Sequence, residues 1–323
     1  MSALDSKTIL LTGGTGSFGK KFVEIALKEH NPKVIRIFSR DEFKQFEMAQ
    51  EFNDERLRFL VGDVKDKDRA QRAMDGVDIV IHAAALKQVP SCEYNPFEAV
   101  KTNILGSQNI VDASIDKGVE KVICLSTDKA VNPVSLYGAT KLCAEKLFVQ
   151  GNAYSGGRKT KIGVVRYGNV VGSRGSVIPV FKEQKEKGVL TVTDNRMTRF
   201  WITQEQAARF VILMLDTMRG GEIFVPKMPS MKLVNLALAI APEAQIKIIG
   251  IRPGEKIGEA LLTLEESRHS KEFDTHFVIE PEFPFWEKLD IGGQPLPEGF
   301  SYSSDNNVWE LNKDDLQKML DTL

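Results

Sequence analysis

The stretch Thr8-Ile-Leu-Leu-Thr-Gly-Gly-Thr-Gly-Ser-Phe-Gly19 decides the fold of this chain. A short apolar run comes first and predicts a buried strand, and a cluster of glycines follows it directly. The glycines permit a tight turn and a close approach of backbone N–H groups to a pyrophosphate, and the helix after them points its positive N-terminus at the phosphates. A glycine cluster alone is weak evidence. Its place between a predicted strand and a predicted helix indicates a dinucleotide-binding unit.

Beyond this stretch, short apolar runs alternate with longer helical patterns as far as Arg166. This alternation is typical of an α/β fold with a doubly wound parallel sheet of the Rossmann type. The predicted strands are Thr8–Leu11, Val34–Phe38, Leu57–Val61, Ile79–Ala83, Lys121–Leu125 and Lys161–Arg166. The predicted helices are Phe18–Glu29, Asp41–Phe52, Asp66–Met74, Ala99–Lys117 and Ser135–Tyr154.

After Arg166 the regular alternation ends. A helix at Gln204–Met218 and a strand at Gly220–Val225 return to the first pattern, whereas the segments around them are mixed. We therefore predict a dinucleotide-binding domain of residues 1–167 and about 203–225. A smaller, interleaved α/β domain of about 168–202 and 226–323 would bind the substrate.

Composition excludes several functions. The chain has 323 residues, of which 43 are basic and 44 acidic, so no overall field favours nucleic acid or an anionic membrane. The N-terminus resembles neither a signal peptide nor a membrane span, and we expect a cytoplasmic protein. Three cysteines lack metal or disulfide spacing and are expected to be buried free thiols. The four histidines do not form a metal motif, His82 is expected in the core, and we predict no metal.

The end of the second predicted strand bears on which dinucleotide is bound. Arg40, with Ser39 beside it and Lys44 one helical turn on, suits the 2′-phosphate of NADP, which we favour over NAD. Asp41 leaves NAD open, because it could bind a ribose hydroxyl instead of capping the next helix. Asp63, followed by Val64, could contact the adenine or cap a turn. In the glycine stretch, the expected cofactor contacts are Gly13, Thr15, Gly16, Ser17, Phe18 and Gly19.

An acid–base segment lies after the fifth predicted strand. Ser126-Thr-Asp-Lys129 is followed by Tyr137-Gly-Ala-Thr-Lys141. Tyr137 and Lys141 are four residues apart, so they share a helix face, and the ammonium could stabilise a phenolate. By itself the pair also suits an ordinary amphipathic helix, and Asp128 with Lys129 also suits a solvated ion pair. The parallel-sheet prediction places all of them at the carboxyl edge, where such sheets bind ligands.

These motifs together resemble a known family. The segments that carry the resemblance to the extended short-chain dehydrogenase/reductases acting on nucleotide sugars are Thr12–Gly19, His82–Ala85, Asn103, Tyr137 with Lys141, and Arg252–Lys256. Within that group the chain is most similar to the UDP-N-acetylglucosamine 4,6-dehydratases that invert carbon 5. The segments carrying this closer likeness are Ala84–Pro90, Ser126–Ala130, Asn132-Pro133, Arg166–Gly172 and Arg196–Trp201. The resemblance covers nearly the whole chain, and one departure is Gly258, where relatives tend to have histidine.

The resemblance implies a reaction in which the redox cofactor is recycled. Tyr137 would take the proton of the sugar 4-hydroxyl while a hydride leaves carbon 4, Lys141 would lower the tyrosine pKa and bind the cofactor ribose, and Thr127 would hydrogen-bond the same oxygen. Lys129 would then remove the proton from carbon 5, and Asp128 would protonate the leaving 6-hydroxyl. The hydride returns to carbon 6, so the enzyme is a hydro-lyase.

Lys129 bears on the stereochemistry. Dehydratases that retain configuration have Ser-Thr-Asp-Glu where this chain has Ser-Thr-Asp-Lys. A lysine base must be neutral when it acts, which requires burial or a neighbouring cation such as Lys87. The implied product is UDP-2-acetamido-2,6-dideoxy-beta-L-arabino-hexos-4-ulose, which serves bacterial surface-sugar biosynthesis of the pseudaminic-acid type.

Further contacts follow from the resemblance. The implied cofactor contacts include Ala83, Ala84, Ala85, Lys87, Asn103, Tyr137 and Lys141. The implied substrate contacts are Lys87, Asn169, Arg199, Arg252 and Glu255, with the arginines on the diphosphate. Family members form homo-oligomers, and a dimer or hexamer is expected. The alternatives are a retaining 4,6-dehydratase, a UDP-sugar 4-epimerase, and an NADP-sensing binding protein on the same fold.

Overall fold

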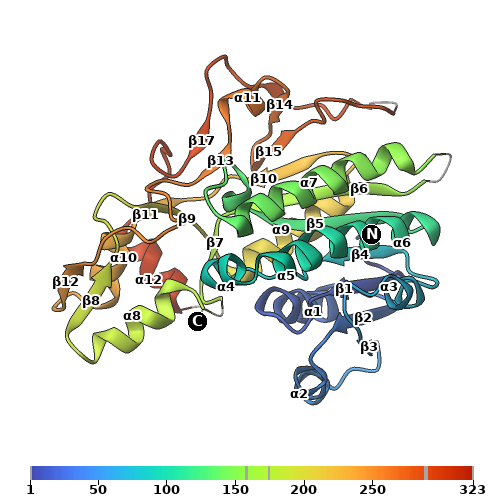
Figure 1. Cartoon of the computed structure of the whole chain (residues 1–323), viewed down its shortest axis with the longest axis horizontal. Helices are drawn as coiled ribbons and strands as arrows, with labels where there is room; N and C mark the ends of the chain where they lie inside the picture. The colour runs from blue at the N-terminus through green and yellow to red at the C-terminus, as the bar shows by residue number, and fades with distance from the viewer. Residues whose placement is uncertain (1, 157–158, 174, 287–289, 322–323) are drawn as a thin grey trace.

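A ten-stranded sheet forms the centre of the molecule (Figure 1). The computed structural model describes residues 2–156, 159–173, 175–286 and 290–321. In spatial order the strands are β16 (Gln294–Pro295), β14 (Ser270–Glu272), β15 (His276–Ile279), β10 (Ile223–Pro226), β6 (Lys161–Tyr167), β5 (Lys121–Thr127), β4 (Ile79–His82), β1 (Thr8–Thr12), β2 (Val34–Ser39) and β3 (Leu57–Val61). From β3 to β10 neighbouring strands are parallel, and β15, β14 and β16 add antiparallel pairs at one edge.

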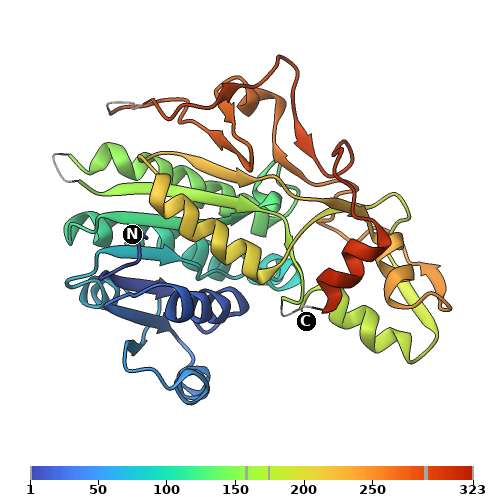
Figure 2. The same ribbon diagram turned by 180° about the vertical axis from the view of Figure 1, so that it is seen from behind.

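Helices cover both faces of this sheet. On one face α6 (Gly106–Asp116) packs between α3 (Lys67–Ala73) and α7 (Leu136–Tyr154). On the other face, which Figure 2 turns to the viewer, α9 (Gln204–Thr217) packs against α1 (Ser17–Glu29). Strand β1 is buried at all five positions because both of its faces are covered. The structure confirms the doubly wound, Rossmann-type fold.

Two predicted helices begin after polar caps. The side chain of Asp41 accepts a hydrogen bond from Lys44 N at 3.0 Å at the start of α2 (Glu42–Phe52). Ser135 Oγ accepts one from Gly138 N at 3.2 Å at the start of α7. Asp41 is therefore the helix cap, one of the two roles that its position allowed.

The helix predicted over Ala99–Lys117 is interrupted. The chain here forms α4 (Val89–Tyr94), α5 (Pro96–Val100), a π-helical turn η1 (Lys101–Leu105) and only then α6. The Asn103 side chain explains the turn: its Oδ1 accepts from Leu86 N at 2.8 Å, and its Nδ2 donates to Leu86 O at 2.9 Å. A π-turn changes the helical register locally, which apolar periodicity does not reveal.

A smaller unit has its own core at one end of the molecule (Figure 1). Its strands are β7 (Asn169–Val170), β9 (Thr198–Ile202) and β11 (Ser230–Lys232) in one sheet, and β8 (Val189–Val192) with β12 (Gln245–Ile248) in another. Its helices are α8 (Val177–Lys185), α10 (Leu233–Ile240) and α12 (Lys313–Asp321). Phe181, Trp201 and Leu236 are among the side chains buried between them.

The predicted boundary near residue 226 differs from the structure. Strands β14 and β15 extend the main sheet, and Phe277 and Ile279 belong to its core. The short strands β13 (Ala260–Leu262) and β17 (Tyr302–Ser303), with helix α11 (Leu264–Ser267), also pack beside the large sheet. Antiparallel strands of three or four residues are too short to show a period in the sequence.

Most residues expected in the core lie there. His82 is buried, its Nδ1 lies 2.8 Å from Thr12 Oγ1, and burial together with the charge of Lys141 lowers its pKa to about 3. Cys92 and Cys124 are buried free thiols, but Cys143 is exposed because its position on α7 faces away from the sheet. Among the described residues, no helix combines the length and the apolar character that a membrane crossing requires.

Candidate active site

A pocket of about 830 Å³ opens at the carboxyl ends of the parallel strands. Residues of the main sheet and of the smaller unit both line it, for example Ser39 and Thr127 on one side and Val180 and Leu233 on the other. This edge is where open α/β sheets bind ligands. The pocket lies within the size range of small-molecule sites.

The glycine turn fits a pyrophosphate. Gly13 has a φ of 65°, and a Cβ there would lie 2.9 Å from Ala84 Cα. A Cβ on Gly19 would lie 2.1 Å from Gly14 O, so α1 packs on the turn only with glycine there. Helix α1 begins after Gly16 without a side-chain cap, which leaves its first N–H groups available to an anion. The predicted contacts of this turn that line the pocket are Gly13, Thr15, Gly16, Ser17, Phe18 and Gly19.

Polar and charged side chains gather near the end of β2, where we predicted contacts with the ribose of the cofactor. Ser39, Arg40, Lys44 and Asp63 line the pocket, as does Asp41. The Lys44 ammonium holds the pKa of the Asp41 carboxyl below its usual value, and the two groups are 2.5 Å apart. Arg40 Nη1 lies 3.9 Å from Asp63 Oδ2, and Asp63 Oδ1 also accepts from Lys65 N at 3.0 Å. Asp63 therefore both shapes a turn and faces the pocket.

The loop after β4 forms the opposite wall. Ala83, Ala84, Ala85, Lys87 and Val64 line the pocket, as predicted for cofactor contacts. Asn103 does not line the pocket. Its side-chain amide is hydrogen-bonded to the backbone of Leu86 and, at 3.0 Å, to Thr140 Oγ1. Asn103 supports the loop from behind. Burial, aided by the charge of Lys129, lowers the pKa of Lys87.

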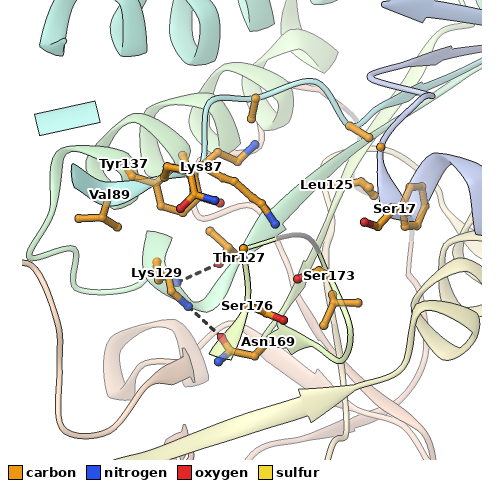
Figure 3. A pocket seen from close by; sticks show the side chains of 18 of the residues that line it. Ser17, Lys87, Val89, Leu125, Thr127, Lys129, Tyr137, Asn169, Ser173 and Ser176 are labelled. Atoms are coloured by element: carbon orange, nitrogen blue, oxygen red, sulfur yellow. Dashed lines mark hydrogen bonds between the residues drawn. The ribbon is translucent and has the colours of Figure 1, made fainter. Parts of the chain in front are cut away.

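The acid–base segment forms a tight hydrogen-bonded turn. Strand β5 ends at Thr127, and the 3-10 turn η2 (Asp128–Ala130) follows. Asp128 Oδ1 accepts from Thr127 Oγ1 and from Lys129 Nζ, each at 2.9 Å. Lys129 Nζ also donates to Asn169 Oδ1 at 3.0 Å, and Figure 3 shows its side chain reaching toward Asn169. Thr127 and Lys129 line the pocket, whereas Asp128 is fully buried behind them.

Tyr137 and Lys141 reach the same pocket from α7. Burial raises the pKa of the Tyr137 phenol well above its usual range, the charge of Asp128 raises it further, and a hydrogen bond with Thr127 lowers it in part. Lys141, which we predicted to lower this pKa, is not among the groups that shift it in this structure. The Lys141 ammonium points toward the sheet, 4.0 Å from Cys124 Sγ, although both residues lie on one helix face.

The predicted substrate contacts also line the pocket, but their side chains differ in exposure and in how many hydrogen bonds they make within the protein. Arg252 is exposed, and its backbone N donates to Glu255 Oε2 at 3.3 Å. Arg199 is buried, with Nη1 donating to Thr198 O at 2.7 Å and to Ile257 O at 2.9 Å, and Nη2 to Lys256 O at 2.9 Å. Arg199 thus holds the segment that carries Arg252, a role that its sequence position did not reveal.

A family model described as polysaccharide biosynthesis protein matches residues 9–281, which include the whole acid–base segment. The chain belongs to this family. A UDP-N-acetylglucosamine 4,6-dehydratase (inverting) from Campylobacter jejuni is 52% identical, with 97% of each chain covered. A UDP-glucose 4-epimerase from Rickettsia conorii is 39% identical, covering 98% of this chain and 96% of the relative. The X-ray structure of Pen from Bacillus thuringiensis is similar with a TM-score of 0.91 and 41% identity, covering 99% of this chain and 98% of that one.

Several residues that line the pocket were not predicted from the sequence. Thr191 lies on β8 and Thr193 directly follows that strand, and this two-residue spacing could have indicated one polar face. Glu259 lies in a segment without apolar periodicity, and nothing in the surrounding sequence marked it as a pocket residue. The other lining residues that we did not predict include Gln88, Val89, Pro90, Ser173, Ser176, Val177, Val180, Phe181, Met197 and Leu233.

Gly258, the departure from the expected histidine, faces Asp305. A Cβ at Gly258 would lie 3.0 Å from Asp305 Cγ. Asp305 Oδ1 also accepts from Ser303 Oγ at 2.6 Å. The Asp305 side chain therefore takes the space that a larger residue at position 258 would need.

Proposed function

We propose that the chain is a UDP-N-acetylglucosamine 4,6-dehydratase that inverts carbon 5. The observation that carries the proposal is the turn at the end of β5: Lys129 enters the same pocket as Tyr137 and is hydrogen-bonded to Asp128 and Asn169. An oxidoreductase would need only Tyr137 with its supporting groups. The extra amine and carboxyl supply the acid–base groups for elimination of water. The relative with 52% identity supports this assignment.

Oxidation at carbon 4 would use the α7 residues. Tyr137 takes the proton of the sugar 4-hydroxyl, with Thr127 as its hydrogen-bond partner. Because burial disfavours the phenolate, Tyr137 needs a cation close to it in the working complex. Lys141 is the group on the same helix face that can supply one. A bound nicotinamide dinucleotide would accept the hydride from carbon 4 and return it to carbon 6.

Elimination across carbons 5 and 6 would use the η2 residues. The 4-keto group acidifies the carbon 5 proton, which Lys129 removes as a neutral amine. Lys87 lines the same pocket, and its positive charge would assist by favouring the neutral form of a nearby amine. Asp128 is buried behind Thr127 and Lys129, so as the acid it would be protonated and would pass its proton to the leaving 6-hydroxyl through Thr127 Oγ1, reversing the hydrogen bond that Thr127 donates to it in this structure. A proton from solvent then adds to carbon 5 on the opposite face, which inverts the centre.

NADP is the proposed cofactor. Arg40 and Lys44 bring two cations to the pocket rim, and Asp41 is engaged as the cap of α2 with Lys44 as its ion-pair partner. A 2′-phosphate would meet these cations, whereas a free ribose hydroxyl would need an uncommitted acid. We also propose that residues 1–167 and about 203–225 bind the cofactor and that the smaller unit binds the nucleotide sugar. We also propose a homo-oligomer, a dimer or a hexamer.

The UDP part would lie along the smaller unit. Arg252 suits the diphosphate, Glu255 the ribose hydroxyls, and Asn169 a phosphate or a sugar hydroxyl. The product, a 4-keto-6-deoxy sugar nucleotide, would be a precursor for bacterial surface sugars of the pseudaminic-acid type.

Proton NMR of the product from UDP-N-acetylglucosamine tests the function. A new 6-methyl signal supports a dehydratase, and the ring couplings report inversion at carbon 5. A 4-epimerase, which the relative with 39% identity keeps as the second candidate, would give an epimer with no methyl signal. Absence of any turnover with cofactor bound would favour a cofactor-sensing protein.

A further inference from the structure

Glu259 is a buried carboxylate in the pocket wall that the proposed chemistry has not used. It directly precedes β13, and its side chain is only 3% exposed. Ser304 fixes its backbone from both sides: Glu259 N donates to Ser304 Oγ at 2.9 Å, and Ser304 N donates to Glu259 O at 2.8 Å. The carboxylate is thus held at one place where the smaller unit meets the main sheet.

Three cations surround this carboxylate. Lys256 Nζ lies 2.8 Å from Oε2, and both Arg199 Nε and Lys129 Nζ lie 4.0 Å from Oε1. Lys256 Nζ also donates to Val131 O at 2.9 Å, directly after the turn that carries Lys129. Glu259 is therefore linked to the elimination lysine both through space and through the backbone beside it.

The arrangement joins the two ends of the substrate site. Lys129 belongs to the sugar end, and Arg199 holds the segment of the diphosphate end. Without a central negative charge these ammonium and guanidinium groups would repel one another. A buried carboxylate between them neutralises that repulsion and restricts where each cation lies.

We infer that Glu259 is a positioning residue for Lys129 in the elimination step, an inference that rests on the proposed dehydratase function. In the resting site Asp128 and Asn169 hold the Lys129 ammonium on the side of β5 and β7, and Glu259 attracts it from the smaller unit. Together they fix the amine at the distance from carbon 5 that proton transfer requires. Oxidation at carbon 4 depends on Tyr137 and does not need this position.

The test separates the two half-reactions in E259Q, which keeps the shape and removes the charge. Cofactor-loaded enzyme is mixed rapidly with UDP-N-acetylglucosamine, and reduced nicotinamide and methyl product are followed over time. We expect oxidation within about twofold of wild type and elimination slowed about tenfold or more, so that reduced nicotinamide accumulates. E259D, which keeps a carboxylate, should recover part of the elimination rate.

E222Q is the matched control, because Glu222 is equally buried but lies outside the pocket, where it accepts from Arg219 N and Gly220 N. We expect it to lower the melting temperature without changing the ratio of elimination to oxidation. Wild-type elimination by E259Q, or equal loss of both half-reactions in folded E259Q and E259D, would overturn the inference. If E259Q does not fold, E259D carries the test. Failure of wild type to form methyl product would instead overturn the proposed function.

Discussion

The N-terminal turn of α7 lies directly on the backbone of Lys129: a Cβ on Gly138 would come within 2.2 Å of Lys129 O. Such a contact is possible only without a side chain. It brings Tyr137, the residue directly before Gly138, to the turn that carries Thr127 and Lys129. The distance between the oxidation and elimination groups is therefore set by one glycine.

Gly138→Ala should separate these two groups. The added methyl must push α7 away from η2, since the nearest atom is backbone and cannot rotate aside. Overpacking of this kind costs about 1–3 kcal/mol, and we expect turnover to fall at least about tenfold. Chemical denaturation and steady-state kinetics measure the two effects. Gly118→Ala is the control. Gly118 follows the end of α6, and a Cβ there would meet no atom within 4 Å. Its positive φ should lower stability when alanine replaces it, but turnover should stay unchanged. Normal turnover by Gly138→Ala would refute the role of this contact.

Lys129→Ala should leave oxidation possible and stop elimination. The substitution removes the amine while Tyr137, Thr127 and Lys141 remain. We expect reduced nicotinamide to form on mixing with substrate and methyl product to fall at least about a hundredfold, as for loss of a general base. Absorbance and NMR follow the two species. Lys146→Ala, on the same helix as Tyr137 but outside the pocket lining, serves as the control. Methyl product at the wild-type rate from Lys129→Ala would remove this lysine from the mechanism.

Arg40→Ala should weaken the binding of NADP more than the binding of NAD. The guanidinium is half exposed at the pocket rim, and a forked contact to a 2′-phosphate would be lost. We expect the Kd for NADP to rise about tenfold and the Kd for NAD to change little, measured by calorimetry. Arg58→Ala on β3 removes a similar charge that lies outside the pocket lining. An equal loss of affinity for both dinucleotides would contradict the proposed preference.

Stability should fall with acid partly through His82. Burial lowers its pKa from 6.5 to about 3, so between these values the unfolded state binds a proton that the folded state does not. The stabilising contribution is present above pH 6.5 and is lost as the pH falls toward 3, by about 1 kcal/mol for each pH unit. Denaturation at several pH values, compared with His82→Gln, isolates this contribution. The same acid sensitivity in both proteins would show that His82 is not its source.

What could be predicted from the sequence is what local segments determine. The strand–glycine–helix order of the first turn and the cap at Asp41 depend on residues close together in the chain. The same holds for the helix face shared by Tyr137 and Lys141. The structure placed each of these where the pattern indicated.

What could not be predicted depends on contacts between distant segments. Asn103 reshapes its helix through Leu86, seventeen residues away, and Arg199 is occupied by carbonyls of Lys256 and Ile257. Asp128 is buried because neighbouring segments cover it, and Glu259 enters the pocket because Ser304 holds its backbone. Such partners leave no periodic or local mark in the sequence.

We propose above all that this pocket eliminates water across carbons 5 and 6 and replaces the carbon 5 proton from solvent. The most direct measurement is NMR of the product formed from UDP-N-acetylglucosamine in deuterated water. We expect deuterium at carbon 5 with the couplings of the inverted centre, a methyl group without solvent deuterium, and no net reduced cofactor. A product that keeps its 6-hydroxymethyl group, or a methyl product with protium at carbon 5, would contradict it.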